Sequence, residues 1–345
     1  MMRIVVSIIA WTVLLVFLAR SLSRLPSAEE WKAFLDADAL KAFFFFALMF
    51  TLALVLRAYR FGILMRQIAP LPWREIAAGF PWLFLIGAVT PFRLGEGMRG
   101  VWASKRGLSA SAALGYWVAE RMFDLIALSV ITIAGFTLSA RSPVEWPLLV
   151  VFLGAVAVFY VLLWGRSAWI ASLVGRLPTV GSRLKTLVLS FAFMQNARLH
   201  ALTIGLTLAI WIVMTTGFWG AFTLLLDAPV PFALALAVTG AVNFAALLSG
   251  APANVGSFQA AVVVCFLAYG LSSEAGLMAS VVPQTAGLMT TVLFGFMGLA
   301  ASRSSRFGHG IGPSNQNGPV SRPADTVGLG PTMHQLSNGQ KRKNG

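Results

Sequence analysis

The stretch TPFRLGEGMRG, residues 90–100, places Arg93, Glu96 and Arg99 at three-residue intervals directly after a long apolar run. Whether those charges lie in water or inside the protein depends on the rest of the chain. Of its 345 residues, 58% are hydrophobic and only 11% are charged, with a mean hydropathy of +0.79. A soluble domain has about a quarter charged residues. The composition therefore predicts a polytopic membrane protein, and an all-α one, because backbone groups in lipid must bond within the helix.

Six apolar runs are long enough for helices that cross about 30 Å of hydrocarbon. These spans lie near 3–19, 41–56, 110–138, 146–165, 201–226 and 276–301, and two broken apolar regions cover 76–107 and 232–270. Basic residues without acids gather in 57–74 and 166–198. The positive-inside rule then places both segments, the N-terminus and the C-terminal tail in the cytoplasm of a multi-pass cell-membrane protein. Topology thus accounts for the net charge of +14, and we expect no nucleic-acid partner.

With this orientation, each broken region must leave the membrane on the side where it entered. Region 76–107 breaks at Pro91 and Gly95, and region 232–270 breaks within SGAPANVGSFQ, at Pro252, Asn254, Gly256 and Gln259. We therefore expect two re-entrant helical hairpins. Proline and glycine have the same four-residue spacing in both, and the halves 1–138 and 146–301 have opposite orientations. This pattern predicts inverted repeats with a substrate site between them.

The composition changes after the last span. Residues 302–345 are rich in glycine, proline, serine and asparagine and end in a basic segment, which predicts a disordered cytoplasmic tail after a transmembrane domain over 1–301. The three histidines and the single cysteine, Cys265, have no metal-ligand spacing, and no nucleotide-binding loop is visible. We expect no metal and no cofactor.

A second charged group, ERMFD, lies in span 110–138, where Glu120 and Asp124 share a helix face and Arg121 precedes Asp124 by three residues. Facing lipid, the six charges of the two groups would cost on the order of 15–20 kcal/mol, so they must face the protein interior or an aqueous cavity. One interpretation is an ion-pair network that only holds helices together. The other is that at least one arginine keeps bonding capacity for an anionic group such as a lipid phosphate. The candidate substrate-binding residues are Arg93, Glu96, Arg99, Glu120, Arg121 and Asp124.

The two charged motifs, PFRLGEGMRG with KRGLS and then ERMFD, resemble the first signature of the lysylphosphatidylglycerol synthase transmembrane region, also called the flippase-like domain. The segment GAPANVGSFQAAVVVCFLAYGLS resembles its second signature, although Ala253 and Asn254 follow Pro252 where the family often has glycine directly after the proline. Gln259 stands where a glutamate is frequent. The resemblance covers about residues 1–301. It implies a membrane domain that moves aminoacylated phospholipid or another lipid-linked headgroup between leaflets, and the short tail leads us to expect no synthase activity.

Three functions remain open from the sequence. The first is translocation of a phospholipid or a lipid-linked headgroup, with a phosphate-bearing membrane lipid as the partner. The second is a non-transporting membrane partner of a glycosyltransferase or lipid-synthesis enzyme. The third is an intramembrane transferase, although no nucleophile–base–orienter set is visible and we do not expect an enzyme. Neither the headgroup, the energy source nor the oligomeric state follows from the sequence.

Overall fold

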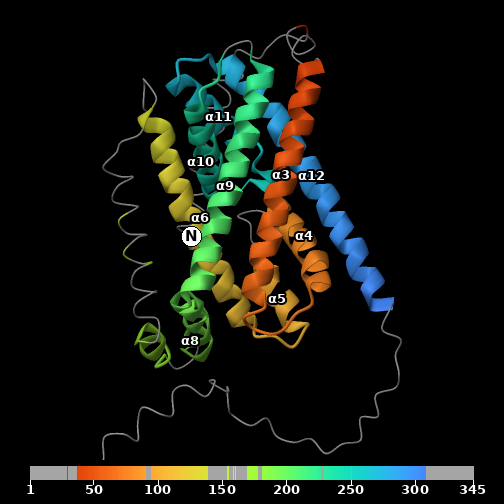
Figure 1. Ribbon diagram of the computed structural model, residues 1–345, viewed down its shortest axis with the longest axis vertical. Coiled ribbons are helices and arrows are strands. Elements are labelled where there is room, and N and C mark those ends of the chain that lie inside the picture. Colours follow the sequence, from red (N-terminus) through yellow and green to blue (C-terminus); the bar gives the residue numbers. More distant parts are fainter. Residues whose placement is uncertain are drawn as a thin grey trace, which may run out of the picture. The chain divides into compact units, whose positions relative to one another are not determined.

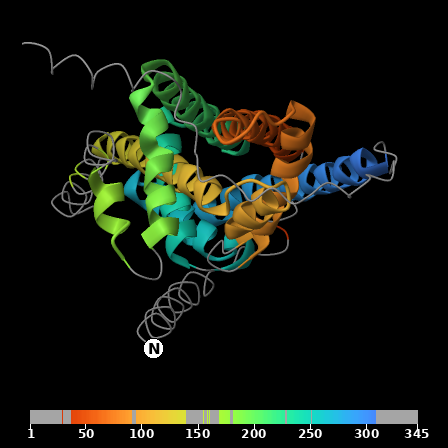
Figure 2. The ribbon, with the colours of Figure 1, turned by 90° about the horizontal axis from the view of Figure 1, so that it is seen from below.

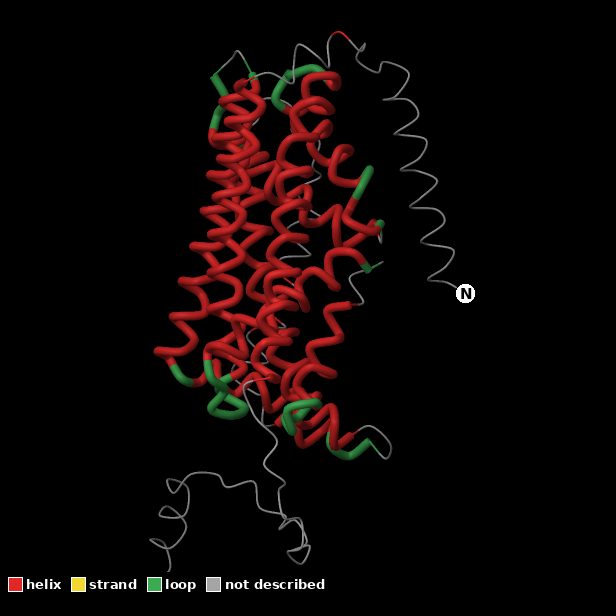
Figure 3. Tube along the Cα trace, turned by 90° about the vertical axis from the view of Figure 1, so that its right-hand side faces the viewer, coloured by secondary structure: helices red, strands yellow, loops and turns green. Residues whose placement is uncertain are grey.

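The computed structural model describes residues 29, 37–90, 95–138, 154, 158, 160, 169–177, 181–226, 229–249 and 251–307. These residues form helices and loops, and no strand occurs among them (Figure 3). The chain divides into two units, Met1–Arg306 and Phe307–Gly345, and the first of them contains the helix bundle. The helices are α3 (Ala37–Met65), α4 (Trp73–Val89), α5 (Met98–Ser104), α6 (Ala110–Thr137), α8 (Gly181–Leu189), η2 (Ser190–Gln195), α9 (Ala197–Leu225), α10 (Phe232–Ser249), η3 (Pro252–Asn254), α11 (Ser257–Ala268) and α12 (Ser273–Phe307).

Three of these helices are long and apolar enough to cross a membrane: α3, α9 and residues Ser273–Ser302 of α12. They coincide with the expected spans near 41–56, 201–226 and 276–301. Helix α6 has 28 residues, but three ionic side chains near its middle reduce its apolar character. The expected span near 3–19 and most of that near 146–165 lie outside the described residues. The protein is therefore an all-α membrane protein, as predicted.

One boundary differs from the prediction in a way that matters for the site. Helix α3 does not end near residue 56 but continues to Met65, so Arg57 and Arg60 belong to the helix and not to a cytoplasmic loop. The reason is burial. Arg60 is only 1% exposed, and the apolar residues around it, among them Phe61 and Leu64, are buried as well.

Both broken regions are helix pairs separated by an interruption. Helix α4 ends at Val89 and α5 begins at Met98, while η3 and the residues around Gly256 separate α10 from α11. Figure 1 shows α4 and α5 in the lower half of the bundle and α10 and α11 in the upper half. Pro91 lies outside the described residues. The helix breaks are thus where the sequence predicts them, and re-entry through one face of a membrane stays a prediction.

The two halves of the bundle pack against each other reciprocally. Helix α3 lies along α9. Helix α10 packs on α6, where Gly240 faces Thr132, and α4 packs on α12, where Gly295 faces Leu85. Viewed along the long axis, part of α12 extends to one side of the other helices (Figure 2). Each helix pair therefore contacts the long helix that follows the other pair, an arrangement that inverted repeats would produce.

Candidate functional site

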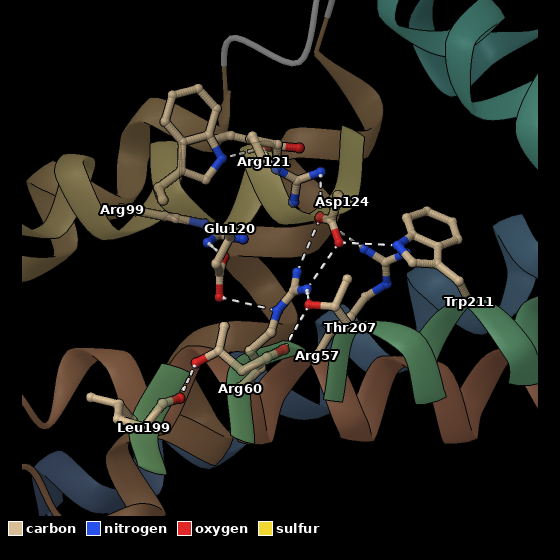
Figure 4. Close-up of polar contacts among 12 residues, drawn as sticks. Arg57, Arg60, Arg99, Glu120, Arg121, Asp124, Leu199, Thr207 and Trp211 are labelled. Atoms are coloured by element: carbon tan, nitrogen blue, oxygen red, sulfur yellow. Dashed lines mark hydrogen bonds and ion pairs between the residues drawn. The ribbon is translucent and has the colours of Figure 1, made fainter. Parts of the chain in front are cut away.

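The charged side chains of three separate segments meet inside the bundle. Helix α3 contributes two arginines, the α4–α5 region contributes a glutamate and an arginine, and α6 contributes the group around residue 120. We call this set the ionic cluster, and its described members are Arg57, Arg60, Glu96, Arg99, Glu120, Arg121 and Asp124. Figure 4 labels all of them except Glu96.

Asp124 lies at the centre of the ionic cluster. Arg60 donates to it in a bidentate manner, with Nη1 2.9 Å from Oδ1 and Nη2 3.0 Å from Oδ2. The indole Nε1 of Trp211, on α9, donates to Oδ1 at 3.2 Å. Arg60 also donates to the Thr207 hydroxyl at 2.6 Å, so α3, α6 and α9 are joined at one point. With Asp124 2% exposed, this pair is shielded from water and needs all of these contacts to offset its desolvation.

Arg99 and Glu120 form a second buried pair. Arg99 Nη1 lies 2.5 Å from Glu120 Oε2, and the side chains are only 4% and 3% exposed. The guanidinium also stacks on Phe61, with 5.1 Å between its central carbon and the ring centroid. Arg60 Nε lies 3.8 Å from the other oxygen of Glu120, which connects the two pairs. Arg99 is thus enclosed by a carboxylate and aromatic rings.

Glu96 holds the beginning of the second limb of the first hairpin against α6. Its Oε2 accepts from Trp117 Nε1 at 2.5 Å and lies 3.5 Å from Arg121 Nε. The preceding residue, Gly95, approaches α4 so closely that an added Cβ would lie 2.5 Å from the carbonyl oxygen of Ile86. A glycine is therefore required there for the hairpin to close and for Glu96 to reach its partners.

The ionic cluster has more positive than negative groups. Its described members are four arginines and three carboxylates, which leaves a formal charge of one positive unit. Arg121 makes longer ion pairs than Arg60 and Arg99: its nitrogens lie 3.5 Å from Glu96 and 3.6 Å from Asp124, and its buried Nε has no hydrogen-bond partner among the described residues. An unsatisfied guanidinium N–H in a low-dielectric site favours an anionic guest.

A cavity of about 480 Å³ opens next to this group. Its wall is mostly aromatic and aliphatic, with side chains from α3, α4, α6, α9, α10, α11 and α12. At one part of the wall lie Arg57, Glu96, Trp117, Arg121, Asp124 and Trp211. Arg60, Arg99 and Glu120 do not line it. Two of the four arginines, Arg57 and Arg121, therefore line the cavity. The other two, Arg60 and Arg99, do not line it and are paired with Asp124 and Glu120.

The interruption of the second hairpin lies on the same cavity. Ala253 and Asn254 line it and both have positive φ, 56° and 57°. Gly256, with φ 84°, directly precedes α11 and donates its N–H to Gln259 Oε1 at 2.8 Å. The other end of the Gln259 amide donates to Gln284 of α12, which also lines the cavity. Both helix breaks therefore contribute to one site.

Five of the six candidate substrate-binding residues lie in the described part of the chain. Glu96, Arg99, Glu120, Arg121 and Asp124 lie together, as expected. Arg93 lies outside the described residues. Gly95 and Asn254 lie at the two breaks, Pro252 begins η3 and Gly256 precedes α11. Gln259 does not line the cavity but contacts Gln284, which does. Arg99, however, faces Glu120 and not the cavity.

Sequence reasoning missed part of the site. Arg57, Arg60, Trp117, Trp211 and Gln284 were not among the candidates. For the two arginines a signal was present: the apolar pattern of span 41–56 continues past them through FGILM, which favours one longer helix. The tryptophans and Gln284 carry no such signal, because an isolated polar group in an apolar helix shows no preferred partner.

Comparison with known proteins identifies one family. The family described as Lysylphosphatidylglycerol synthase TM region matches residues 2–295. No curated protein and no solved structure matches the chain.

Proposed function

Because the chain belongs to the family of lysylphosphatidylglycerol synthase transmembrane regions, which indicates a function connected with membrane lipids, we propose that it moves a phospholipid or a lipid-linked headgroup between the leaflets of the cell membrane. The cavity beside the ionic cluster is the proposed binding site. Lipid phosphate is the proposed anionic group.

The observation that carries this proposal is the incompletely neutralised Arg121 on the cavity wall. Arg121 has a buried N–H without a hydrogen-bond partner among the described residues, and the ionic cluster around it is one positive charge in excess. Arg57 adds a second guanidinium to the wall, 3.9 Å from Asp124 and over the Trp211 ring. A phosphate presents oxygens that match such planar donors, and its charge balances the excess.

The wall of the cavity suits a lipid as well as its phosphate. Phenylalanines from α3, α4, α9 and α11 line it, as do aliphatic side chains of α10 and α12. Apolar surface of this kind accepts acyl or isoprenoid chains, whereas a small soluble anion would leave it bare. The position of the cavity between two interrupted helix pairs supports alternating access from the two sides of the membrane. In the proposed orientation the N-terminus and the tail are cytoplasmic.

Reconstitution tests this function. The full chain is placed in liposomes with acyl-labelled fluorescent phosphatidylglycerol, and dithionite added outside bleaches the label that reaches the outer leaflet. We expect the protein to make inner-leaflet label accessible, and Arg121→Gln to reduce that rate at least tenfold by removing the cation from the wall. Arg74→Gln is the matched control, since Arg74 is exposed at the start of α4 and should leave the rate unchanged.

Unchanged flip in a folded Arg121→Gln protein would contradict the assigned role of Arg121. Absence of flip in the unmodified protein would contradict translocation itself, and copurification of a lipid-modifying enzyme in that case would favour the membrane-partner function.

A further inference from the structure

Three residues with amide side chains line a second part of the same cavity. Asn243 comes from α10, Asn254 from η3 and Gln284 from α12. The Asn243 amide donates to the Thr239 carbonyl of its own helix at 2.8 Å, whereas Gln284 bonds to residues of other elements. A polar side chain is costly to leave in an apolar wall unless it has partners, so Gln284 is the residue of interest here.

Gln284 is held in place and still has bonding capacity. Its Oε1 accepts from Gln259 Nε2, and its Nε2 donates to the carbonyl of Ala253 at 3.4 Å. An amide carries two N–H hydrogens and two lone pairs on oxygen. Among the described residues, the Gln284 side chain therefore uses one N–H and one oxygen lone pair and keeps one N–H and one lone pair for a further partner. Gln284 is only 9% exposed.

The backbone beside Gln284 is in an unfavourable conformation. Ala253 has φ 56°, a left-handed conformation that is unfavourable for a residue with a Cβ. This turn aims the Ala253 carbonyl at Gln284 and brings Asn254 to the cavity wall. Conformations of this kind persist where the surroundings hold them and concentrate at binding sites.

The cavity is poorly suited to a cationic headgroup. Its two described lining carboxylates, Glu96 and Asp124, both lie within 4 Å of arginines, and the ionic cluster as a whole is positive. An ammonium group would add to that positive charge, and amides cannot neutralise it. Hydroxyl groups, in contrast, both donate and accept, as amides do.

We infer that the preferred substrate is a lipid whose headgroup joins one anionic phosphate to a neutral hydroxyl-bearing group, with Arg121 at the phosphate and Gln284 at the hydroxyls. This inference rests on the proposed function, because it takes the cavity to be the lipid site. It excludes an aminoacylated, cationic headgroup as the preferred substrate.

Lipid binding to the purified full chain in detergent, followed by native mass spectrometry, tests the inference. Three probes with identical acyl chains are compared: phosphatidylglycerol, phosphatidylpropanol (which has the same charge but no hydroxyls) and phosphatidylglycerol esterified with lysine. A hydrogen bond between uncharged groups is worth about 0.5–1.5 kcal/mol, so we expect phosphatidylglycerol to bind about 2–10-fold more tightly than phosphatidylpropanol. The lysyl ester should bind most weakly.

Two substitutions locate the discrimination. Gln284→Met keeps the size of the side chain and removes the amide, so phosphatidylglycerol should fall to the affinity of phosphatidylpropanol, which should not change. Gln284→Glu adds a carboxylate to the wall and should weaken phosphatidylglycerol while strengthening the lysyl ester. Gln67→Met, at an exposed glutamine after α3, is the matched control and should change nothing.

Tightest binding of the lysyl ester, or equal binding of all three lipids, would overturn the inference. Unchanged discrimination in Gln284→Met would overturn the role of Gln284. If Gln284→Met does not fold, as judged by thermal unfolding, the ranking by the unmodified protein and the response of Gln284→Glu decide the matter. Selective lipid binding without flip in liposomes would overturn translocation but leave the inferred headgroup preference intact. Flip without selective binding would overturn the headgroup preference but leave translocation intact.

Discussion

At the scale of single residues, the four arginines of the ionic cluster have two different environments. Arg60 and Arg99 are almost completely buried and bonded at 2.9 Å and 2.5 Å to Asp124 and Glu120. Arg57 and Arg121 line the cavity, with nitrogens 3.5–3.9 Å from the carboxylate oxygens of Glu96 and Asp124. Arg60 and Arg99 therefore hold the carboxylates of the ionic cluster in place, and Arg57 and Arg121 are the candidates for binding substrate.

Breaking the central pair should be costly. Asp124→Asn removes the charge that balances Arg60, and an uncompensated buried charge destabilises by about 3–5 kcal/mol. We expect a large fall in the thermal unfolding temperature in detergent, and recovery of most of it in the double variant Asp124→Asn/Arg60→Met. Asp38→Asn breaks the exposed pair with Lys41 and should have a far smaller effect. Equal losses in Asp124→Asn and Asp38→Asn would show that the central pair is not structurally important.

The three acids of this cluster, Glu96, Glu120 and Asp124, were predictable because a charge that faces lipid is prohibitively costly, and so were Arg99 and Arg121. Arg57 and Arg60 were assigned to a cytoplasmic loop by the rule that places cations there, although the apolar pattern that continues through FGILM favours a longer helix. A long cationic side chain near a helix end can extend to water or turn inward. Whether the side chain extends to water or turns inward depends on the position of Asp124 relative to α3. That position is set by tertiary packing, which the local sequence does not specify.

At the scale of helices, glycines set how closely the two halves approach. An added Cβ at Gly135 of α6 would lie 2.3 Å from the backbone nitrogen of Ala237 in α10, and backbone cannot move aside as a side chain can. We expect Gly135→Ala to destabilise by about 1–3 kcal/mol through overpacking. Gly205→Ala on α9 is the matched control, because nothing lies within 4 Å of its added Cβ.

Thermal unfolding of both glycine variants measures the difference. Gly205→Ala should be neutral or slightly stabilising, since alanine is the better helix former. An equal loss in the two variants would mean that helix propensity, and not the α6–α10 contact, dominates.

The interruptions of the hairpins were predictable at this scale, but their chemistry was not. Proline and glycine mark both breaks in the sequence because they end helices. The positive φ of Ala253 carries no sequence signal, since alanine ordinarily avoids that conformation. The packing of Gln284 beside it is likewise set by α12, whose place in the bundle no local pattern specifies.

At the scale of the whole described unit, reciprocal packing relates the two halves. Helix α10 of the second hairpin contacts α6, and α4 of the first contacts α12. Both interruptions then lie on one cavity. In the function that we propose, a site shared in this way opens to either side when one helix pair moves relative to the other half.

The same arrangement predicts which connections lie on which side of the membrane. Figure 1 shows the α5–α6 connection at the lower end of the bundle and the α11–α12 connection at the upper end. Lys105 and Ser272 are exposed in these connections. With the basic segments in the cytoplasm, Lys105→Cys should react with a membrane-impermeant maleimide in inside-out vesicles only, and Ser272→Cys in right-side-out vesicles only. The native Cys265 is fully buried, so the unmodified protein is the unlabelled control. Labelling of both positions from the same side would contradict the opposite entry of the two hairpins, and with it the alternating access on which translocation depends.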